Sequence, residues 1–81
     1  MKELLETIVK ALVERKDQAF VNEIKGEQAT VLEISVAPED MGKVIGKEGR
    51  IASSIRTIAK AAASVDHRRV TVEIIQKQNK N

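Results

Sequence analysis

Apolar and polar residues alternate along the chain with two different periods, and each period predicts one kind of element. Between residues 1 and 16 the apolar positions recur every three or four residues, which is the spacing of an amphipathic helix. The opposite positions carry acidic residues first and basic residues later, in the order that the helix dipole favours. We therefore predict a helix over residues 1–16, with an apolar stripe formed by Leu4, Leu5, Ile8, Leu12 and Val13.

Three later segments alternate residue by residue, as half-buried strands do. Residues 20–25 and 29–36 are separated by a turn at residues 26–28 and predict an antiparallel hairpin, and residues 70–75 predict a last strand. The one aromatic residue, Phe20, is expected in the core rather than on a binding surface. The expected sheet therefore has three strands.

Two helices are predicted between the second and third strands. Pro38 ends the second strand and suits the first position of a short helix, which Gly46 then ends. A longer helix begins near residues 49–50, and its apolar stripe contains Ile51, Ile55, Ile58, Ala59 and Ala62. The order α-β-β-α-α-β predicts an α+β fold in which helices cover one face of the sheet. We assign residues 1–76 to this single domain and residues 77–81 to a polar tail.

Composition narrows the range of functions. Of the 81 residues 42% are apolar and 32% are charged, and charges interrupt every apolar stretch, so neither a membrane span nor a signal peptide is expected. The chain has no cysteine, which excludes disulfides, thiolate metal sites and cysteine nucleophiles and favours a cytoplasmic location. Its single histidine, His67, lies in a charged turn and is interpreted as a solvated loop residue. We therefore predict that the protein is not an enzyme and needs neither a metal nor another cofactor.

The net charge of +2 conceals an uneven distribution. Residues 1–40 hold five Lys or Arg and nine Asp or Glu, for a charge of −4. Residues 41–69 hold seven Lys or Arg and two Asp or Glu, for a charge of +5. A basic segment beside an acidic one is consistent with a polyanionic partner, and equally with chance clustering in a short chain.

A glycine-bracketed loop of sequence GKEG, at residues 46–49, joins the two middle helices. Glycine permits positive φ and removes side chains that would hold a ligand away from the main chain. The following helix directs its first N–H groups toward this gap, so a phosphate can approach the backbone between Lys43, Lys47 and Arg50. The flanking apolar residues are Val44, Ile45 and Ile51.

The glycine pair does not fit the two common nucleotide-binding loops. A P-loop needs GxxxxGK[ST] and the dinucleotide fingerprint needs GxGxxG, and the chain contains neither. A helix C-cap followed by a tight turn also accounts for two glycines at a helix–helix joint. The loop taken alone leaves this purely structural role open.

The wider context of the loop is more specific. The stretch VIGKEGRI, set between a short helix opened by Pro38 and a long helix with isoleucines at positions 51, 55 and 58, resembles the signature of the KH domain. In KH domains a GXXG loop clamps the backbone of about four nucleotides of single-stranded RNA or DNA. The element order is similar to the type II variant, and the length and the stretch APEDMGKVIGKEGR resemble the bacterial KhpA (YlqC) family.

The resemblance carries several expectations. It implies a mixed sheet with one parallel strand pair and a cytoplasmic protein that binds single-stranded RNA, or single-stranded DNA, as an RNA chaperone or post-transcriptional regulator. It also implies a homodimer or a heterodimer with a KhpB (Jag)-like KH protein. The family is further linked to cell shape and cell-wall homeostasis.

Carried over residue by residue, the RNA-backbone clamp is Gly46, Lys47, Glu48 and Gly49, with Lys43 and Arg50 as flanking cations. The apolar groove would draw on Val44, Ile45, Ile51, Ser54 and Val72, with residues 25–28 as the variable loop. Glu48 departs from the family's usual basic or small residue. It is expected to cancel part of the charge of Lys47 and so to lower the affinity for RNA.

A protein-interaction adaptor is the alternative function. The long helix contains a surplus of small apolar residues, which would permit a close helix–helix contact between two chains, although alanine is also simply the best helix former. The candidate dimer surface is Ile58, Ala61, Ala62 and Ala63. Of these, Ile58 and Ala62 are expected to serve the core first, which leaves Ala61 and Ala63 as the more informative positions.

Overall fold

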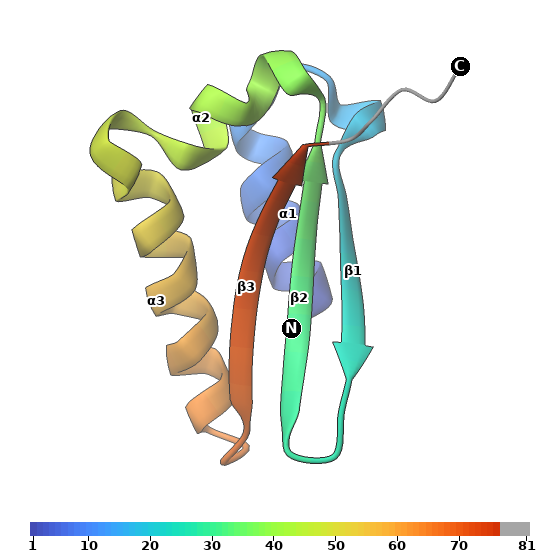
Figure 1. The fold of residues 1–81 in the computed structure, drawn as a ribbon, viewed down its shortest axis with the longest axis vertical. Coiled ribbons are helices and arrows are strands. Elements are labelled where there is room, and N and C mark those ends of the chain that lie inside the picture. Colours follow the sequence, from blue (N-terminus) through green and yellow to red (C-terminus); the bar gives the residue numbers. More distant parts are fainter. Residues whose placement is uncertain (77–81) are drawn as a thin grey trace.

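The computed structural model describes residues 1–76 and has the predicted order α-β-β-α-α-β (Figure 1). Its helices are α1 (Lys2–Leu12), α2 (Met41–Ile45) and α3 (Arg50–Ser64), and its strands are β1 (Phe20–Lys25), β2 (Ala29–Val36) and β3 (Arg69–Gln76). Three single 3₁₀ turns, at Lys16–Gln18, Pro38–Asp40 and Lys47–Gly49, connect them.

The sheet is mixed, as expected, with β2 in the centre of the order β1-β2-β3. β1 and β2 form an antiparallel hairpin in which Phe20 lies opposite Ser35. β2 and β3 are parallel, because the chain crosses back through α2 and α3 before β3 begins. This topology makes β3 an edge strand, and α3 lies alongside it (Figure 1).

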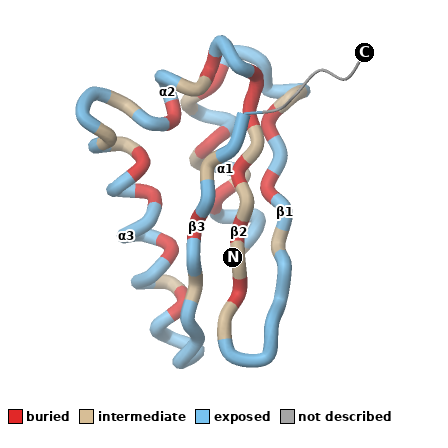
Figure 2. The backbone as a smooth tube through the Cα atoms, viewed as in Figure 1, coloured by how far each residue is buried: buried red, intermediate tan, exposed pale blue. Residues whose placement is uncertain are grey.

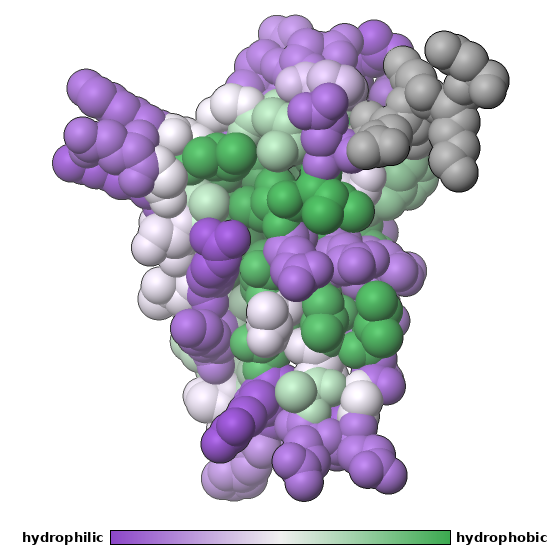
Figure 3. Space-filling view, in the orientation of Figure 1, coloured by the Kyte–Doolittle hydropathy of each residue, from purple (hydrophilic) through white to green (hydrophobic). Residues whose placement is uncertain are grey.

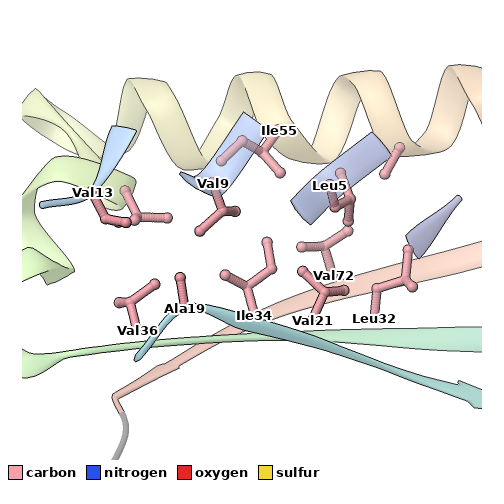
Figure 4. Close-up of a cluster of buried hydrophobic side chains, with 12 residues drawn as sticks. Leu5, Val9, Val13, Ala19, Val21, Leu32, Ile34, Val36, Ile55 and Val72 are labelled. Atoms are coloured by element: carbon pink, nitrogen blue, oxygen red, sulfur yellow. The ribbon is translucent and has the colours of Figure 1, made fainter. Parts of the chain in front are cut away.

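The core lies between the helices and one face of the sheet. Buried and half-buried positions alternate along β2, as a strand with one covered face requires (Figure 2). α1 contributes two buried residues that lie one turn apart, Leu5 and Val9. α3 contributes buried alanines, whose small side chains bring its backbone close to the sheet. Figure 4 shows the side chains meeting there, among them Leu5, Val9, Val21, Leu32, Ile34, Ile55 and Val72.

The first helix is shorter than predicted: it ends at Leu12 and not at residue 16. Val13 has extended dihedral angles, φ −97° and ψ 158°. The next two amides donate to the carboxylate of Asp40 instead of to helix carbonyls, with distances of 3.2 Å from Glu14 N and 2.9 Å from Arg15 N. A side chain distant in sequence therefore ends α1 one turn early.

Three burial predictions were wrong. Phe20 is 50% exposed, because its register opposite Ser35 directs it to the face of the sheet that none of the three helices covers. Ile58 is 42% exposed, since it lies about 100° around the helix from the buried Ala59. Ala63 is only 6% exposed and continues the buried row of α3, so it cannot belong to an accessible dimer surface.

Candidate nucleic-acid interface

The GKEG turn (residues 46–49) projects from the fold where α2 meets α3, at the upper left of Figure 1. α2 ends with the amide of Gly46 bonded to the carbonyl of Gly42 at 2.9 Å. The amide of Gly49 then bonds to the carbonyl of Gly46 at 3.1 Å, which closes a single 3₁₀ turn. Such a turn provides no internal acceptor for the N–H groups of its own first residues, Lys47 and Glu48.

The two glycines of this turn are needed for different reasons. Gly46 has φ 77° and ψ 175°, a combination that is essentially restricted to glycine. A Cβ at this position would also lie 2.6 Å from Cγ1 of Ile51. Gly49 is left-handed, with φ 74° and ψ 15°, but a Cβ there would meet nothing within 4 Å. The first glycine is therefore required by both conformation and space, and the second by conformation alone.

Glu48 also departs from ordinary backbone geometry, with φ 57° and ψ 25°. Its carboxylate Oε1 lies 3.3 Å from Nη2 of Arg50. The ion-pair partner of Glu48 is therefore Arg50 and not Lys47, and the expected lowering of RNA affinity by Glu48 stays a prediction. Within residues 1–76, Lys47 is exposed and forms no ion pair. Lys47 is thus the cation of the turn that is available to a phosphate.

Lys43, the other predicted flanking cation, is already engaged. Its Nζ lies 3.5 Å from Oδ1 of Asp40 and 4.0 Å from Oε1 of Glu14. These contacts join the start of α2 to the end of α1. Lys43 therefore contributes mainly to holding α2 in place, although its side chain is 43% exposed.

Asp40 is a buried carboxylate that fixes the position of α2. Its side chain is fully buried and accepts hydrogen bonds from the amides of Arg15 and Glu14. The bond from the Arg15 amide, helped by the Glu14 amide and by Lys43, holds the pKa of Asp40 below its ordinary value despite the opposing effect of burial. The carboxylate is thus charged at neutral pH and ties the helix before the GKEG turn to the end of α1.

A hollow lies between the second half of α3 and the start of β3. We call the path from the GKEG turn along the β3 side of α3 to this hollow the α3–β3 groove. Arg56, on the β3 side of α3, donates from Nε to the carbonyl oxygen of Val72 at 3.3 Å. One turn further along, Lys60 lines the lower part of the groove together with Arg68, Arg69, Val70 and Thr71. Four of the seven Lys and Arg residues of the segment 41–69, namely Arg56, Lys60, Arg68 and Arg69, therefore lie along this groove.

Sequence reasoning missed Arg56 and Lys60 as site residues. Their i, i+4 spacing beside the apolar stripe of α3 was visible, but it is equally typical of a solvated helix face. Which side of α3 faces β3 depends on tertiary packing, and the bond from Arg56 to Val72 fixes it.

Several predicted groove residues lie elsewhere. Val44 and Val72 are 0% and 5% exposed, so their side chains belong to the core and cannot line a groove. Ile45 is 37% exposed and Ile51 is half-buried against Gly46, which leaves these two as the apolar surface beside the turn. Ser54 is exposed, but its hydroxyl donates to the carbonyl of Arg50 at 2.9 Å.

The turn at residues 25–28, predicted as the variable loop, lies at the end of the sheet farthest from the GKEG turn (Figure 1). Glu27 and Gln28 share a hollow there with residues 66–68, the turn between α3 and β3. Of these two turns only the α3–β3 turn contributes to the groove, through Arg68, and the role predicted for residues 25–28 stays a prediction. His67 in this turn is exposed with φ 57°, in agreement with its interpretation as a solvated loop residue.

Comparison with known proteins identifies the fold family. The KhpA/KhpB KH domain matches residues 2–74. This chain belongs to the KhpA/KhpB KH-domain family. The RNA-binding protein KhpA of Clostridium acetobutylicum is 63% identical over 75 residues, covering 93% of this chain and all of the relative. The protein of the same name from Borreliella burgdorferi is 49% identical over 73 residues, covering 90% of this chain and 89% of the relative.

A solved structure extends the likeness of fold. Era, crystallised in complex with MgGDPNP and nucleotides 1506–1542 of 16S ribosomal RNA, matches with a TM-score of 0.59. The match covers 94% of this chain and 29% of the Era chain, at 22% identity. This KhpA/KhpB-family domain therefore shares its chain path with part of a much longer protein.

Membrane spans and metal clusters are both missing from the described part of the chain. Within residues 1–76, no helix is both long and apolar enough to span a membrane. The same residues contain no group of three His, Cys, Asp or Glu side chains arranged to hold a metal ion.

Proposed function

We propose that this protein binds single-stranded RNA, with the GKEG turn seated on the sugar–phosphate backbone and the strand continuing along the α3–β3 groove. The observation that carries the proposal is the exposed, glycine-shaped turn at the head of a groove lined by cations. Lys47 is available to a phosphate, and the turn places its main chain where no bulky side chain intervenes. The relatives named RNA-binding protein KhpA support the same partner.

The positions of the cations define the path that the bound RNA would follow. Lys47 and Arg50 lie at the turn, Arg56 one to two helical turns further along, and Lys60 one turn beyond that. Since Arg50 and Lys60 are ten residues apart on α3 and a helix rises 1.5 Å per residue, this path is about 15 Å long. It offers contact to the roughly four nucleotides that a KH domain holds. Single-stranded DNA presents the same phosphates, so selectivity for RNA would have to come from contacts to the 2′-hydroxyl.

Base recognition should be broad. Aromatic platforms contribute about 1–3 kcal/mol per stacked base in single-strand binders. The one aromatic residue, Phe20, lies on the face of the sheet opposite the helices, away from the groove. Affinity then rests on phosphates and aliphatic contacts, which suits an RNA chaperone or post-transcriptional regulator in the cytoplasm. A role in cell-shape and cell-wall homeostasis would be exerted through the RNAs that are bound.

The double substitution Lys47→Asp/Glu48→Asp tests this function. It reverses the available charge and keeps both glycines, and Asp tolerates the left-handed conformation at position 48. Titration of a fluorescent single-stranded RNA by anisotropy should show an affinity about tenfold lower or worse, with an unchanged circular dichroism spectrum. The matched control is Lys10→Asp/Glu6→Asp, the same charge change on α1, away from the turn and the groove. Equal losses in the two variants, or no loss in the first, would refute the clamp.

A second function, protein association through α3, is favoured by a specific surface. Ile58 is 42% exposed and Val65 is 78% exposed on the side of α3 that faces neither the sheet nor the α3–β3 groove. Ala61 is exposed and Ala62 half-buried beside them, whereas Ala63 is in the core. We propose that this surface forms a homodimer or pairs with a KhpB (Jag)-like KH protein. Two domains on one strand would also strengthen weak RNA binding through avidity.

Light scattering over a concentration series tests the association. Ile58→Glu and Ala61→Glu should each lower the mass toward that of the monomer by placing a charge in the contact. Ser53→Glu, on the same helix but about 140° around the axis from Ile58, should leave the mass unchanged. A wild-type protein that stays monomeric, alone and with a KhpB-like partner, would reject this surface.

A further inference from the structure

The sheet has a face that none of the three helices covers, and Figure 3 views the molecule from that side. The strand register arranges its outward side chains in rows across the three strands. One row is Phe20, Ser35 and Ile75, the next is Asn22, Glu33 and Glu73, and the third is Ile24, Val31 and Thr71. We call this surface the outer face. Figure 3 shows two apolar patches separated by a hydrophilic band, which is the order of these rows.

The two apolar rows are unusually exposed for a small domain. Phe20, Ile24 and Ile75 are 50%, 47% and 42% exposed, and all three lie on this one face. The solvated face of a sheet usually carries polar residues, because water replaces a second layer there. Large apolar side chains gathered on one exposed face mark an interaction surface.

The middle row supplies the charge. Glu33 and Glu73 are direct partners in the parallel pairing of β2 and β3, so two carboxylates project side by side. The side-chain amide of Asn22 donates from Nδ2 to Oε1 of Glu33 at 3.4 Å. Within residues 1–76, neither Glu33 nor Glu73 forms an ion pair with a Lys or Arg side chain. Like charges directly opposite each other destabilise a sheet. A cation held between the two apolar rows would remove this repulsion.

We infer that the outer face is a docking surface for an amphipathic helix of a partner protein, with a Lys or Arg between two apolar anchors. The apolar rows are four residues apart along a strand, which is about 13 Å. On a helix, positions i and i+8 share one side and are about 12 Å apart. The fitting helix therefore has apolar residues at i and i+8 and a basic residue at i+4.

The same charges disfavour the other occupants. Nucleic acid would bring phosphates against Glu33 and Glu73, and a second copy placed face to face would bring four carboxylates together. The outer face and the α3–β3 groove meet at Thr71, which belongs to the third row and also lines the groove, whereas the anchors Phe20 and Ile24 lie on β1, two strands away from α3. The domain could then hold RNA with its helical side and a protein helix with its sheet.

Designed peptides and NMR test the inference with the intact protein. The probe is a 15-residue stapled helix with Leu at i and i+8 and Arg at i+4, and its control has Glu at i+4. Titration into ¹⁵N-labelled protein should shift the amides of β1 and β3 most, and the Arg peptide should bind about tenfold more tightly than the Glu peptide. Glu33→Gln/Glu73→Gln should abolish that difference, whereas Glu3→Gln/Glu27→Gln, two exposed carboxylates away from the outer face, should preserve it.

Four outcomes would overturn the inference. These are equal affinity of the two peptides for the wild-type protein, an absence of binding at millimolar peptide, shifts confined to α3, and shifts of the β1 amides of the outer face caused by single-stranded RNA or by raising the protein concentration alone. The last of these would assign the surface to RNA or to a second copy. Retention of the wild-type amide spectrum outside the outer face shows that the glutamine variant is folded.

Discussion

Gly46 and Ile51 approach so closely that a Cβ on the glycine would lie 2.6 Å from Cγ1 of the isoleucine. The first residue of the GKEG turn is therefore packed against the first turn of α3. The turn stands in solvent, yet its base is fixed by the core-facing side of the helix that follows. This contact explains how an exposed loop can keep a defined shape for a phosphate.

Gly46→Ala should destabilise the fold by about 3 kcal/mol, since it combines a glycine-only conformation with an overlap against Ile51. Gly49→Ala should cost about 1 kcal/mol, because only its left-handed φ opposes a side chain. Gly42→Ala, in helix α2 with open space around it, should be neutral or stabilising. Urea unfolding followed by circular dichroism measures all three. Equal costs at positions 46 and 49 would contradict the packing argument.

Glu48→Gln should raise the affinity for single-stranded RNA several-fold, because it frees the guanidinium of Arg50 from its ion pair. In an Arg50→Gln background the same change should give a smaller gain, since the released cation is then missing. Glu3→Gln, with the same loss of charge on α1, provides the control for net charge. A gain that is equal in the two backgrounds would show that Glu48 acts by long-range repulsion and not through Arg50.

Arg56→Gln should weaken RNA binding and reduce the slope of log affinity against log salt by about 0.7, the value for one phosphate contact on a single strand. Arg56→Lys keeps the charge but loses the Nε–H that reaches the carbonyl of Val72, so it should retain most of the salt slope. Arg15→Gln removes an exposed cation that pairs with Glu39, away from the groove, and should leave the slope unchanged. Anisotropy titrations at several salt concentrations provide the measurement. An unchanged slope in Arg56→Gln would remove Arg56 from the proposed path.

Acid should weaken the fold through Asp40. The Arg15 amide, with Glu14 and Lys43, lowers the pKa of this carboxyl in the folded state, so its contribution is present above the ordinary pKa of about 4 and is lost as pH falls below it. Asp40→Asn should lower stability at neutral pH and flatten the decline in stability between about pH 5 and pH 3. Asp17→Asn, an exposed aspartate, is the control. A variant at position 40 whose acid decline matches the wild type would contradict this role.

Local patterns predicted most of the fold, and tertiary contacts account for what they missed. The alternation of residues 20–25 and 29–36 predicted β1 and β2 at their observed bounds, and Pro38 and Gly46 bracketed the short helix region as expected. The early end of α1 could not be predicted locally, because the acceptor of the amides that follow the helix, Asp40, lies 25 residues beyond Arg15.

The candidate site also has some features that local sequence predicted and others that depend on tertiary packing. The GKEG turn followed from two glycines and their neighbours, which are local features. The residues that line the groove could not be predicted from local features. Val44 and Val72 fit the apolar pattern equally well whether their side chains face a ligand or the core, and the structure places both in the core. Arg56 was recognisable only after packing had placed it against the edge of β3. Phe20 was misplaced since alternation alone does not say which face of a sheet is covered.

NMR titration of the ¹⁵N-labelled protein with a short single-stranded RNA tests the central claim most directly. The account predicts the largest amide shifts at residues 46–50, smaller ones along the Arg56 and Lys60 side of α3 and the first half of β3, and none on β1. Its contradiction would be a shift map centred on β1 or on α1, with residues 46–50 unmoved at saturation.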